Sequence, residues 1–302
     1  MKRAAAYLTL LLCSSASCAQ AQTDGVPQRS STTPPSAKRG DSMVLIHGGT
    51  FQMGIDASDI PRFQKIFSIE SAKLFQDEVP RHTITVQDFY IDKNLVTNAQ
   101  FKNFVDAHPL WRRNGSLSKS AGFDNGNYLR HWETPNSENA KPDQPVVNVS
   151  WYAATGYCRW AGKRLPTEAE WEFAARGGQD ALFPWGDKLP DETRANFNND
   201  IGTTTPVGSY PANPYGLFDM AGNVWQFLYD EWAPYGQTSA EKQKPPESTL
   251  YQLTPLPEPR HVIRGGSYAG APINLWVEYR DSHPAGGSQP FVGFRCAGSA
   301  SN

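Results

Sequence analysis

The stretch from His261 to Ala297 reads H-V-I-R-G-G-S-Y-A-G-A-P-I-N-L-W-V-E-Y-R-D-S-H-P-A-G-G-S-Q-P-F-V-G-F-R-C-A. Residues 262–263 predict a short strand that runs into Arg264 and two glycines, where backbone can approach a neighbour closely. A second predicted strand carries Trp276, Glu278, Tyr279 and Arg280. Short strands separated by glycine turns indicate an irregular fold, and the composition of the whole chain favours the same type of fold.

Composition favours one loop-rich globular domain. The chain has 302 residues, is rich in Trp, Tyr, Gly and Pro, and carries little charge, which argues against a helical bundle. We assign the domain to residues 43–298 and a tail to 299–302. Residues 22–42, rich in Ser, Thr, Pro and Gln, are expected to be a disordered linker because they cannot bury enough apolar surface to order themselves.

The N-terminus predicts export. Residues 1–21 combine a basic start, an apolar run and a small-residue end, which is typical of a cleavable signal peptide and places the mature protein in the periplasm. We expect no transmembrane segment, since no stretch approaches the roughly 20 apolar residues needed. The less favoured alternative is a lipoprotein attached at Cys18. Removing the signal's two basic residues leaves 26 basic and 30 acidic groups, a net charge of −4, so no nucleic-acid partner is expected.

The mature chain keeps two cysteines. Cys13 and Cys18 lie in the signal, whereas Cys158 and Cys296 remain in an oxidising compartment, where we expect them to pair. The alternative is two separately buried thiols.

The first part of the domain predicts strands and one helix. Residues 43–46 and 49–53 alternate in hydrophobicity around a glycine turn, which predicts a hairpin. Residues 55–77 are less regular and suggest an insertion with a short helix at 63–74. The further predicted elements are strands at 83–86 and 89–92, and a helix that follows the N-cap Thr97 and carries Phe101, Phe104 and Val105.

A long excursion runs from His108 to Pro145. It contains the aromatic residues Trp111, Phe123, Tyr128 and Trp132. Long ordered loops are often functional, so the excursion is either a substrate-facing wall or a decorative insertion.

Stronger signals follow the excursion. Residues 146–149 predict a buried strand, and Ser150 then caps a helix over 151–161. Thr167 and Glu170 form a capping box that opens a second helix ending at Arg176.

Several motifs, in order, resemble one family. They are W-Y-A-A-T-G-Y-C-R-W-A-G-K-R-L-P-T-E-A-E-W-E-F-A-A-R-G-G from Trp151, F-P-W-G from Phe183, N-P-Y-G-L-F-D-M-A-G-N-V-W-Q-F from Asn213, and then R-G-G-S-Y and G-F-R-C-A. Together they resemble the formylglycine-generating-enzyme, or sulfatase-modifying-factor, family. The resemblance implies a single irregular α+β domain related to C-type lectins, with little regular secondary structure, and a disulfide between Cys158 and Cys296.

The family's copper chemistry is not expected in this chain. The family oxidises a substrate cysteine with two cysteines that follow the G-G-S-aromatic block, but here residues 269–275 contain none. A thiolate is the soft ligand that holds Cu(I). A second branch binds iron through histidines of an additional domain, and the six histidines here show no two-His helix motif.

Glu278 is the residue that we predict to be catalytic. Where the family reads V-A-A-R-S, this chain reads V-E-Y-R-D over 277–281. A partly desolvated glutamate can act as a general base near neutral pH. The alternative is that Glu278 only pairs with a core arginine, namely Arg264, Arg280 or Arg295. The residues predicted to shape a substrate pocket are Ser267, Tyr279, Arg280, Trp225 and His283.

The resemblance also implies calcium as a structural cation. One family loop matches Asp219, Gly222, Val224 and Gln226, whose oxygens suit a hard cation. The family usually has glutamate where this chain has Gln226, which should weaken the site. A second set matches Asn196, Phe197 and Asp200, with a plain loop as the alternative.

An exported member without the copper cysteines is similar to the family's periplasmic pyoverdine-maturation proteins. That resemblance implies an oxidoreductase that converts the dihydropyoverdine chromophore of a small peptide siderophore precursor to pyoverdine, with dioxygen or an unidentified electron acceptor. No flavin or nicotinamide motif is present. An alternative is a cysteine-free oxidase of another exported peptide.

A rival hypothesis from another class is a non-catalytic binding protein with a protein partner, like the family's periplasmic regulators of type VI secretion. Fold alone cannot choose between enzyme and binder. A buried Glu278 that faces a pocket favours the enzyme, and a paired Glu278 beneath a flat aromatic patch favours the binder.

Overall fold

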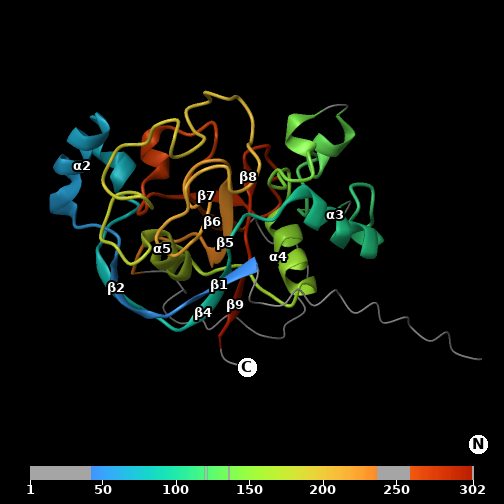
Figure 1. The fold of residues 1–302 in the computed structure, drawn as a ribbon, viewed down its shortest axis with the longest axis horizontal. Coiled ribbons are helices and arrows are strands. Elements are labelled where there is room, and N and C mark those ends of the chain that lie inside the picture. The colour runs from blue at the N-terminus through green and yellow to red at the C-terminus, as the bar shows by residue number, and fades with distance from the viewer. Residues whose placement is uncertain (1–41, 119, 121, 135–136, 237–258, 301–302) are drawn as a thin grey trace, which may run out of the picture. The chain divides into compact units, whose positions relative to one another are not determined.

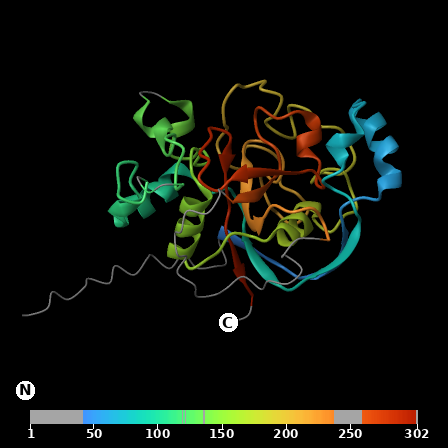
Figure 2. The same ribbon diagram turned by 180° about the vertical axis from the view of Figure 1, so that it is seen from behind.

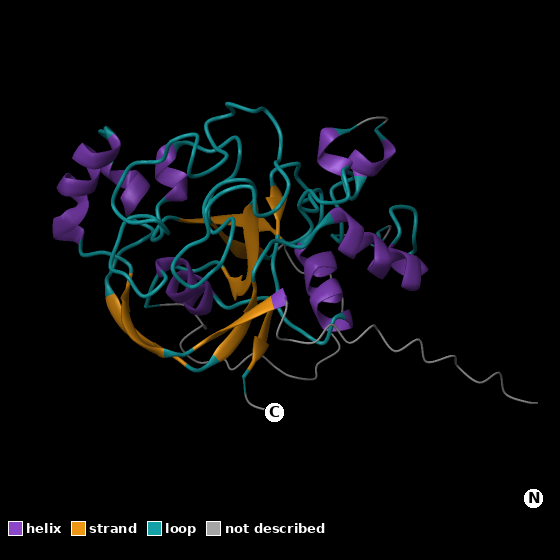
Figure 3. Cartoon of the chain, in the orientation of Figure 1, coloured by secondary structure: helices purple, strands orange, loops and turns teal. Residues whose placement is uncertain are grey.

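The computed structural model describes residues 42–300, apart from 119, 121, 135–136 and 237–258 (Figure 1). The predicted signal peptide and nearly all of the predicted linker lie outside this range. Short helices and small sheets are joined by long loops (Figure 3), so the predicted α+β class with little regular secondary structure is confirmed. Among the described residues, no helix combines the length and apolarity that crossing a bilayer requires.

Within this part of the chain, the strands form three small sheets. Their orders are β1-β4-β9, β2-β3 and β7-β6-β5-β8, and only the β5–β8 pair is parallel. The strands are β1 Met43–Ile46, β2 Gly49–Met53, β3 His82–Val86, β4 Phe89–Asp92, β5 Trp225–Glu231, β6 Arg260–Arg264, β7 Arg280–Pro284, β8 Val292–Gly293 and β9 Ala297–Ser299.

One bent antiparallel ribbon connects the first two sheets. The pairs Met43–Asp92 and Met53–His82 share one register, so β1 and β2 run along β4 and β3 (Figure 1). The ribbon bends at Gly48, where a Cβ atom would lie 2.1 Å from a backbone oxygen of the opposite chain segment. The predicted hairpin between β1 and β2 is therefore wrong: the hydrophobic alternation identifies the strands, but their partners come from beyond the insertion.

Side-chain caps open three helices at the predicted residues Thr97, Ser150 and Thr167. At Thr167 the hydroxyl accepts a hydrogen bond from the backbone N–H of Glu170 at 3.2 Å, and the Glu170 carboxylate accepts from the Thr167 N–H at 2.9 Å. The α-helices are α2 Ile60–Phe67, α3 Asn98–Ala107, α4 Trp151–Trp160 and α5 Glu168–Arg176. The 3₁₀ turns are η1 Ala57–Asp59, η2 Ala72–Phe75, η3 Pro109–Trp111, η4 Arg130–Glu133, η5 Glu138–Ala140 and η7 Pro272–Leu275.

Thr167→Ala should lower the free energy of unfolding by about 1 kcal/mol, because it removes the acceptor for a helix N–H group that has no other intrahelical partner. Urea denaturation followed by circular dichroism measures the change. Thr167→Ser is the matched control, since it keeps the oxygen and should retain most of the stability. Equal losses in both variants would contradict a capping role.

The predicted helix over 63–74 is wrong: this range is divided between two short elements, α2 and η2. Ser68 has a left-handed φ of 55° and ends α2, and η2 begins only at Ala72. The two elements pack their aromatic rings on Trp276, whose ring centroid lies 4.5 Å from that of Phe63. The insertion therefore covers the segment that follows η7.

Two predicted strands also differ from the structure. The run 146–149 is buried but forms no strand, because Asn148 has a φ of 51° and its N–H donates to the Gln289 carbonyl of a distant loop. The strand predicted from Trp276 begins at Arg280, since the backbone before it closes a turn on the Trp276 carbonyl.

The ribbon of the aromatic excursion lies beside α3 and α4 (Figure 2), and its aromatic side chains pack into the core. Phe123 and Tyr128 are buried, and Trp111 and Trp132 pack half-buried against the same core cluster. In the described part of the excursion, its aromatic side chains therefore support the core rather than form a substrate-facing wall.

The predicted disulfide is confirmed. Cys158 on α4 is bonded to Cys296, which precedes β9, and both residues are fully buried. The bond joins the middle of the domain to its C-terminal segment.

Candidate functional site

Glu278 lies in the turn between η7 and β7 and is 8% exposed. Its Oε1 accepts a hydrogen bond from Nη2 of Arg176 at 2.9 Å. Its Oε2 is buried and has no hydrogen-bond partner among the residues that the structure describes. An acceptor without a partner is costly in a protein interior and indicates a group available to a ligand or a proton.

The last turn of α5 holds Glu278 in place. Glu172 and Arg176 lie one turn apart on this helix, and Arg176 donates to Glu172 Oε1 at 2.8 Å as well as to Glu278. Arg264 of β6 binds the other oxygen of Glu172 and the backbone carbonyl of Glu278. Of the predicted arginine partners, only Arg264 contacts Glu278, and it does so through the backbone.

The sequence did not identify Arg176 as the ion-pair partner of the Glu278 carboxylate. The available signal was local: Arg176 follows Glu172 by four residues on a helix, a spacing that brings the two side chains together. The contact with Glu278 crosses 102 residues of chain, and no pattern in the sequence marks it.

Burial raises the pKa of Glu278 to about 7. The positive charge of Arg176 opposes this rise, and the negative charge of Glu172 adds to it. Desolvation favours the neutral form of a carboxyl group. Glu278 can therefore gain and lose a proton close to neutral pH, as a general base must.

Glu278 also forms part of the wall of a cavity of about 330 Å³ between β2 and the C-terminal end of α5. The aromatic part of the wall is the edge-to-face pair of Phe51 and Phe173, with ring centroids 5.3 Å apart. The full set of lining residues is Thr50, Phe51, Gln52, Gly54, Arg81, Phe173, Arg176, Gly178, Gln179, Asp180 and Glu278.

The other predicted pocket residues do not line this cavity. Trp225 contacts Tyr279 with ring centroids 6.1 Å apart, and the His283 ring lies 5.7 Å from that of Phe227. Ser267 is buried. The structure therefore places Glu278 apart from the aromatic residues that the sequence grouped with it.

The contacts of Arg280 hold elements of the fold together. Its guanidinium donates two hydrogen bonds to Glu168, at 2.8 and 2.9 Å, and lies over the rings of Tyr235 and Trp232. A buried bidentate pair of this kind fixes geometry. Arg280 thus anchors β7 to the first turn of α5.

His283 is held neutral. Its pKa is lowered to about 4 by burial and by the nearby charge of Arg260. The ring is packed so tightly that a Cβ atom on Gly287 would lie 2.6 Å from its Nε2.

The first predicted calcium set is already occupied by protein hydrogen bonds. Gln226 Nε2 donates to the Asp219 carbonyl at 2.9 Å, and Gln226 Oε1 accepts from Trp171 at 3.0 Å and from Arg295 at 2.7 Å. Arg295 also donates to the Asp219 carbonyl, at 3.1 Å. Because a fixed guanidinium already donates to both oxygens, and its positive charge would repel a cation, the loop that contains Gly222 and Val224 fits calcium poorly.

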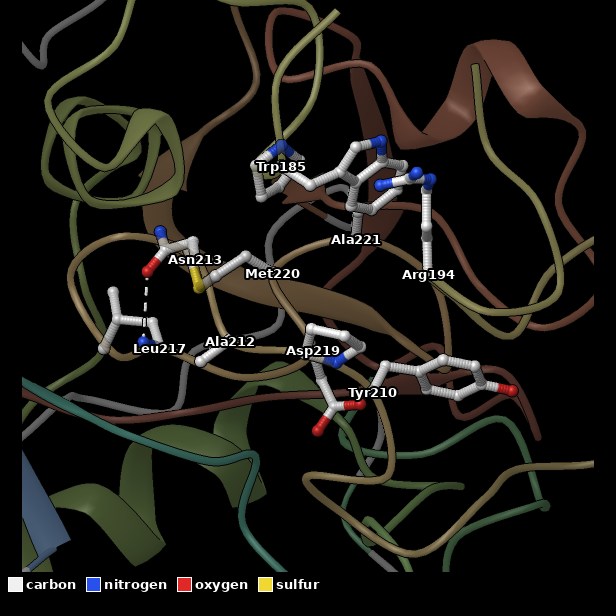
Figure 4. A pocket seen from close by; sticks show the side chains of 11 residues that line it. Trp185, Arg194, Tyr210, Ala212, Asn213, Leu217, Asp219, Met220 and Ala221 are labelled. Atoms are coloured by element: carbon white, nitrogen blue, oxygen red, sulfur yellow. Dashed lines mark hydrogen bonds between the residues drawn. The ribbon is translucent and has the colours of Figure 1, made fainter. Parts of the chain in front are cut away.

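Figure 4 shows the surroundings of Asp219. The residue lines a cavity of about 10 Å³ beside Trp185, Arg194 and Tyr210, which is room for about one water molecule. Its carboxylate accepts a hydrogen bond from the Gly208 N–H at 2.8 Å.

The second predicted set fits a cation better. Asn196 Oδ1 is buried without a partner among the described residues, so it would supply a free oxygen, and Asp200 would supply a carboxylate. Phe197, which lies between these two residues in the sequence, has a buried side chain. The Asp200 carboxylate is exposed and accepts from the Asn198 side chain at 3.1 Å, so a cation there would compete with this bond. In the described part of the chain, no three His, Cys, Asp or Glu side chains gather as a metal-binding group.

The domain has the formylglycine-generating-enzyme type of fold. It is an irregular α+β domain, and a disulfide fixes its C-terminal G-F-R-C segment. The chain belongs to this family, since residues 29–300 match the sulfatase-modifying factor enzyme 1-like domain. Both cysteines of residues 43–302 are in the disulfide, so this domain has no free thiolate of the kind that binds copper in the family.

Three similar proteins illustrate the range of the family. The formylglycine-generating enzyme of Streptomyces coelicolor is 35% identical, over 88% of this chain and 91% of its own length. The serine/threonine-protein kinase pkn1 of Chlamydia pneumoniae is 35% identical over 84% of this chain, but the chain spans only 37% of the kinase's length. The solved structure of PvdO from Pseudomonas aeruginosa has a TM-score of 0.61 and 26% identity, over 85% of this chain and 94% of PvdO.

Proposed function

We propose that the protein is an exported oxidoreductase of siderophore maturation, which oxidises a dihydropyoverdine-type chromophore in the periplasm with Glu278 as general base. The observation that carries the proposal is the buried carboxylate on a cavity wall, with one oxygen unpartnered and a pKa raised to about 7. The similarity to PvdO in fold and the predicted signal peptide add support.

The reaction balances without a protein-bound redox group. The dihydro substrate loses two electrons and two protons, and one of these protons passes to Glu278. Dioxygen takes up both electrons and, with the protons released from substrate and base, becomes hydrogen peroxide. General-base assistance of this kind typically contributes about 10²- to 10⁴-fold in rate.

An aerobic absorbance time course with purified mature protein and a dihydropyoverdine-type precursor tests the proposal. We expect the conjugated chromophore to form faster than it does spontaneously, with one hydrogen peroxide released per chromophore. Heat-denatured protein is the control. Equal rates with and without protein would overturn the assignment for this substrate.

The binding-protein hypothesis is supported by one observation, the ion pair between Glu278 and Arg176. A carboxylate that is tied to a guanidinium can serve structure alone. The excursion's inward-facing aromatic residues speak against the flat aromatic patch that this hypothesis requires. Partner capture becomes the proposal if the oxidation assay fails.

A further inference from the structure

The cavity beside Glu278 has more negative than positive groups around it. Arg81 forms ion pairs with Asp56 and Asp59, at 3.2 and 2.8 Å. One guanidinium thus faces two acidic side chains. Arg81 therefore has little capacity left to attract an anionic ligand.

The second arginine of the cavity wall is even more fully engaged. Arg176 forms ion pairs with Glu172, Asp180 and Glu278. Glu172 is shared with Arg264, which also lies 3.5 Å from Glu168. Glu168 is left out of the count because it pairs with Arg280. Five other carboxylates then face the three arginines Arg81, Arg176 and Arg264, namely Asp56, Asp59, Glu172, Asp180 and Glu278. When all of these groups are ionised, the negative charges exceed the positive charges by two.

The cavity wall also carries a buried acceptor, Oε2 of Glu278. Glu278 Oε2 has no hydrogen-bond donor among the described residues, although the side chain is only 10% exposed. A donor that carries positive charge would satisfy this oxygen and would neutralise part of the excess. Charge-assisted hydrogen bonds are about twice as strong as neutral ones.

Two aromatic side chains form part of the cavity wall beside Arg176, whose guanidinium carbon lies 5.8 Å from the ring centroid of Phe51. Phe51 and Phe173 are half-buried and lie edge to face, so each offers part of its ring to the cavity. A volume of about 330 Å³ is at the lower end of the range for small-molecule sites. Such a wall favours a flat, apolar body of modest size.

We propose that this cavity binds a cationic amine or amidinium group carried on a flat aromatic body, with the positive group on Glu278 and the aromatic body against Phe51 and Phe173. The inference rests on the proposed function only in placing the substrate at Glu278. Binding at equilibrium requires no oxidation, so the two proposals can fail separately.

Isothermal titration calorimetry with three isosteric probes tests the inference. The probes are benzamidine, benzamide and benzoate, which share one ring and differ in charge. We expect benzamidine to bind about tenfold or more tightly than benzamide, since a hydrogen bond between two charged groups is stronger than one between a charged and a neutral group. Benzoate should bind more weakly than either. Equal affinities for benzamidine and benzamide, or no binding of benzamidine, would overturn the proposal.

Two variants locate the site. Glu278→Gln keeps the shape of the side chain and should reduce the preference for benzamidine to about twofold or less, whereas Asp106→Asn removes an exposed carboxylate on α3 and should leave the preference unchanged. If Glu278→Gln does not fold, Asp180→Asn replaces it. The Asp180 side chain is 99% exposed, so its removal should weaken benzamidine selectively without unfolding the domain. If the Glu278 variant keeps the full preference for benzamidine over benzamide, the cation binds elsewhere and the inference is overturned. The same holds for the Asp180 variant when it replaces the Glu278 variant.

The two proposals are separated by comparing this result with the oxidation assay. If benzamidine binds as expected but the precursor is not oxidised, the cation site stands and the oxidoreductase proposal falls. If the precursor is oxidised but the probes show no preference for positive charge, the oxidoreductase stands and this inference falls.

Discussion

Replacing both cysteines of the disulfide, as C158A/C296A, should lower the free energy of unfolding by about 5 kcal/mol in the chain-entropy model. The bond joins residues that are 138 positions apart, so it removes much of the conformational freedom of the unfolded chain. A loss of this size approaches the whole stability of many domains. We therefore expect the variant to be partly unfolded at physiological temperature.

Urea denaturation without reductant gives the difference in free energy. Replacing both cysteines avoids a free thiol, which would exchange disulfides with other chains. Wild-type protein that is denatured in the presence of reductant should approach the midpoint of the variant. If the variant unfolds within 1 kcal/mol of the oxidised wild type, the loop-entropy argument does not hold for this domain.

The features that the sequence predicted well are local or come from the motif order. Thr97, Ser150 and Thr167 cap helices because each has its bonding partner within three residues, and such short-range chemistry is visible in a sequence. The pairing of Cys158 with Cys296 followed from there being two cysteines in an oxidising compartment.

The features that the sequence missed depend on long-range pairing. The strands at 43–53 show clear alternation, yet nothing in them says that they pair with 82–92 across an insertion. The buried run 146–149 has the composition of a strand, but the left-handed conformation of Asn148 prevents one. Periodicity reports which face is buried and does not report the partner.

In the candidate site, too, one feature is visible in the local sequence and another depends on long-range contacts. Glu278 stood out because a carboxylate replaces a small residue of the family motif. Its cavity could not be predicted, because the walls come from β2, the end of α5 and the turn before β7. The sequence predicts one pocket for Glu278 together with Tyr279 and His283, which are close to it in the chain, and Trp225, which belongs to another family motif. Successive residues of an extended or turning segment point in different directions, so Tyr279 packs on Trp225 while Glu278 faces Arg176.

Under the proposed function, Glu278→Gln should lower the rate constant of chromophore oxidation by about 10²- to 10⁴-fold, the usual contribution of a general base. The amide has the shape of the carboxylate, and its oxygen can still accept the hydrogen bond from Arg176, so the fold should persist. Circular dichroism and a thermal melt verify folding. Asp106→Asn serves as the matched control and should oxidise the precursor at the wild-type rate.

The pH profile separates a base from a merely structural carboxylate. Burial raises the pKa of Glu278 to about 7, and only the ionised form can accept a proton. The wild-type rate should therefore increase with pH and level off above about 7, and below this value it should fall about tenfold per pH unit. Glu278→Gln has no titrating group at this position, so its residual rate should lack that rise. A variant that keeps the wild-type rate, or a residual rate with the same midpoint near pH 7, would show that the proton goes to another group and that Glu278 serves only to hold Arg176 in the wall of the cavity.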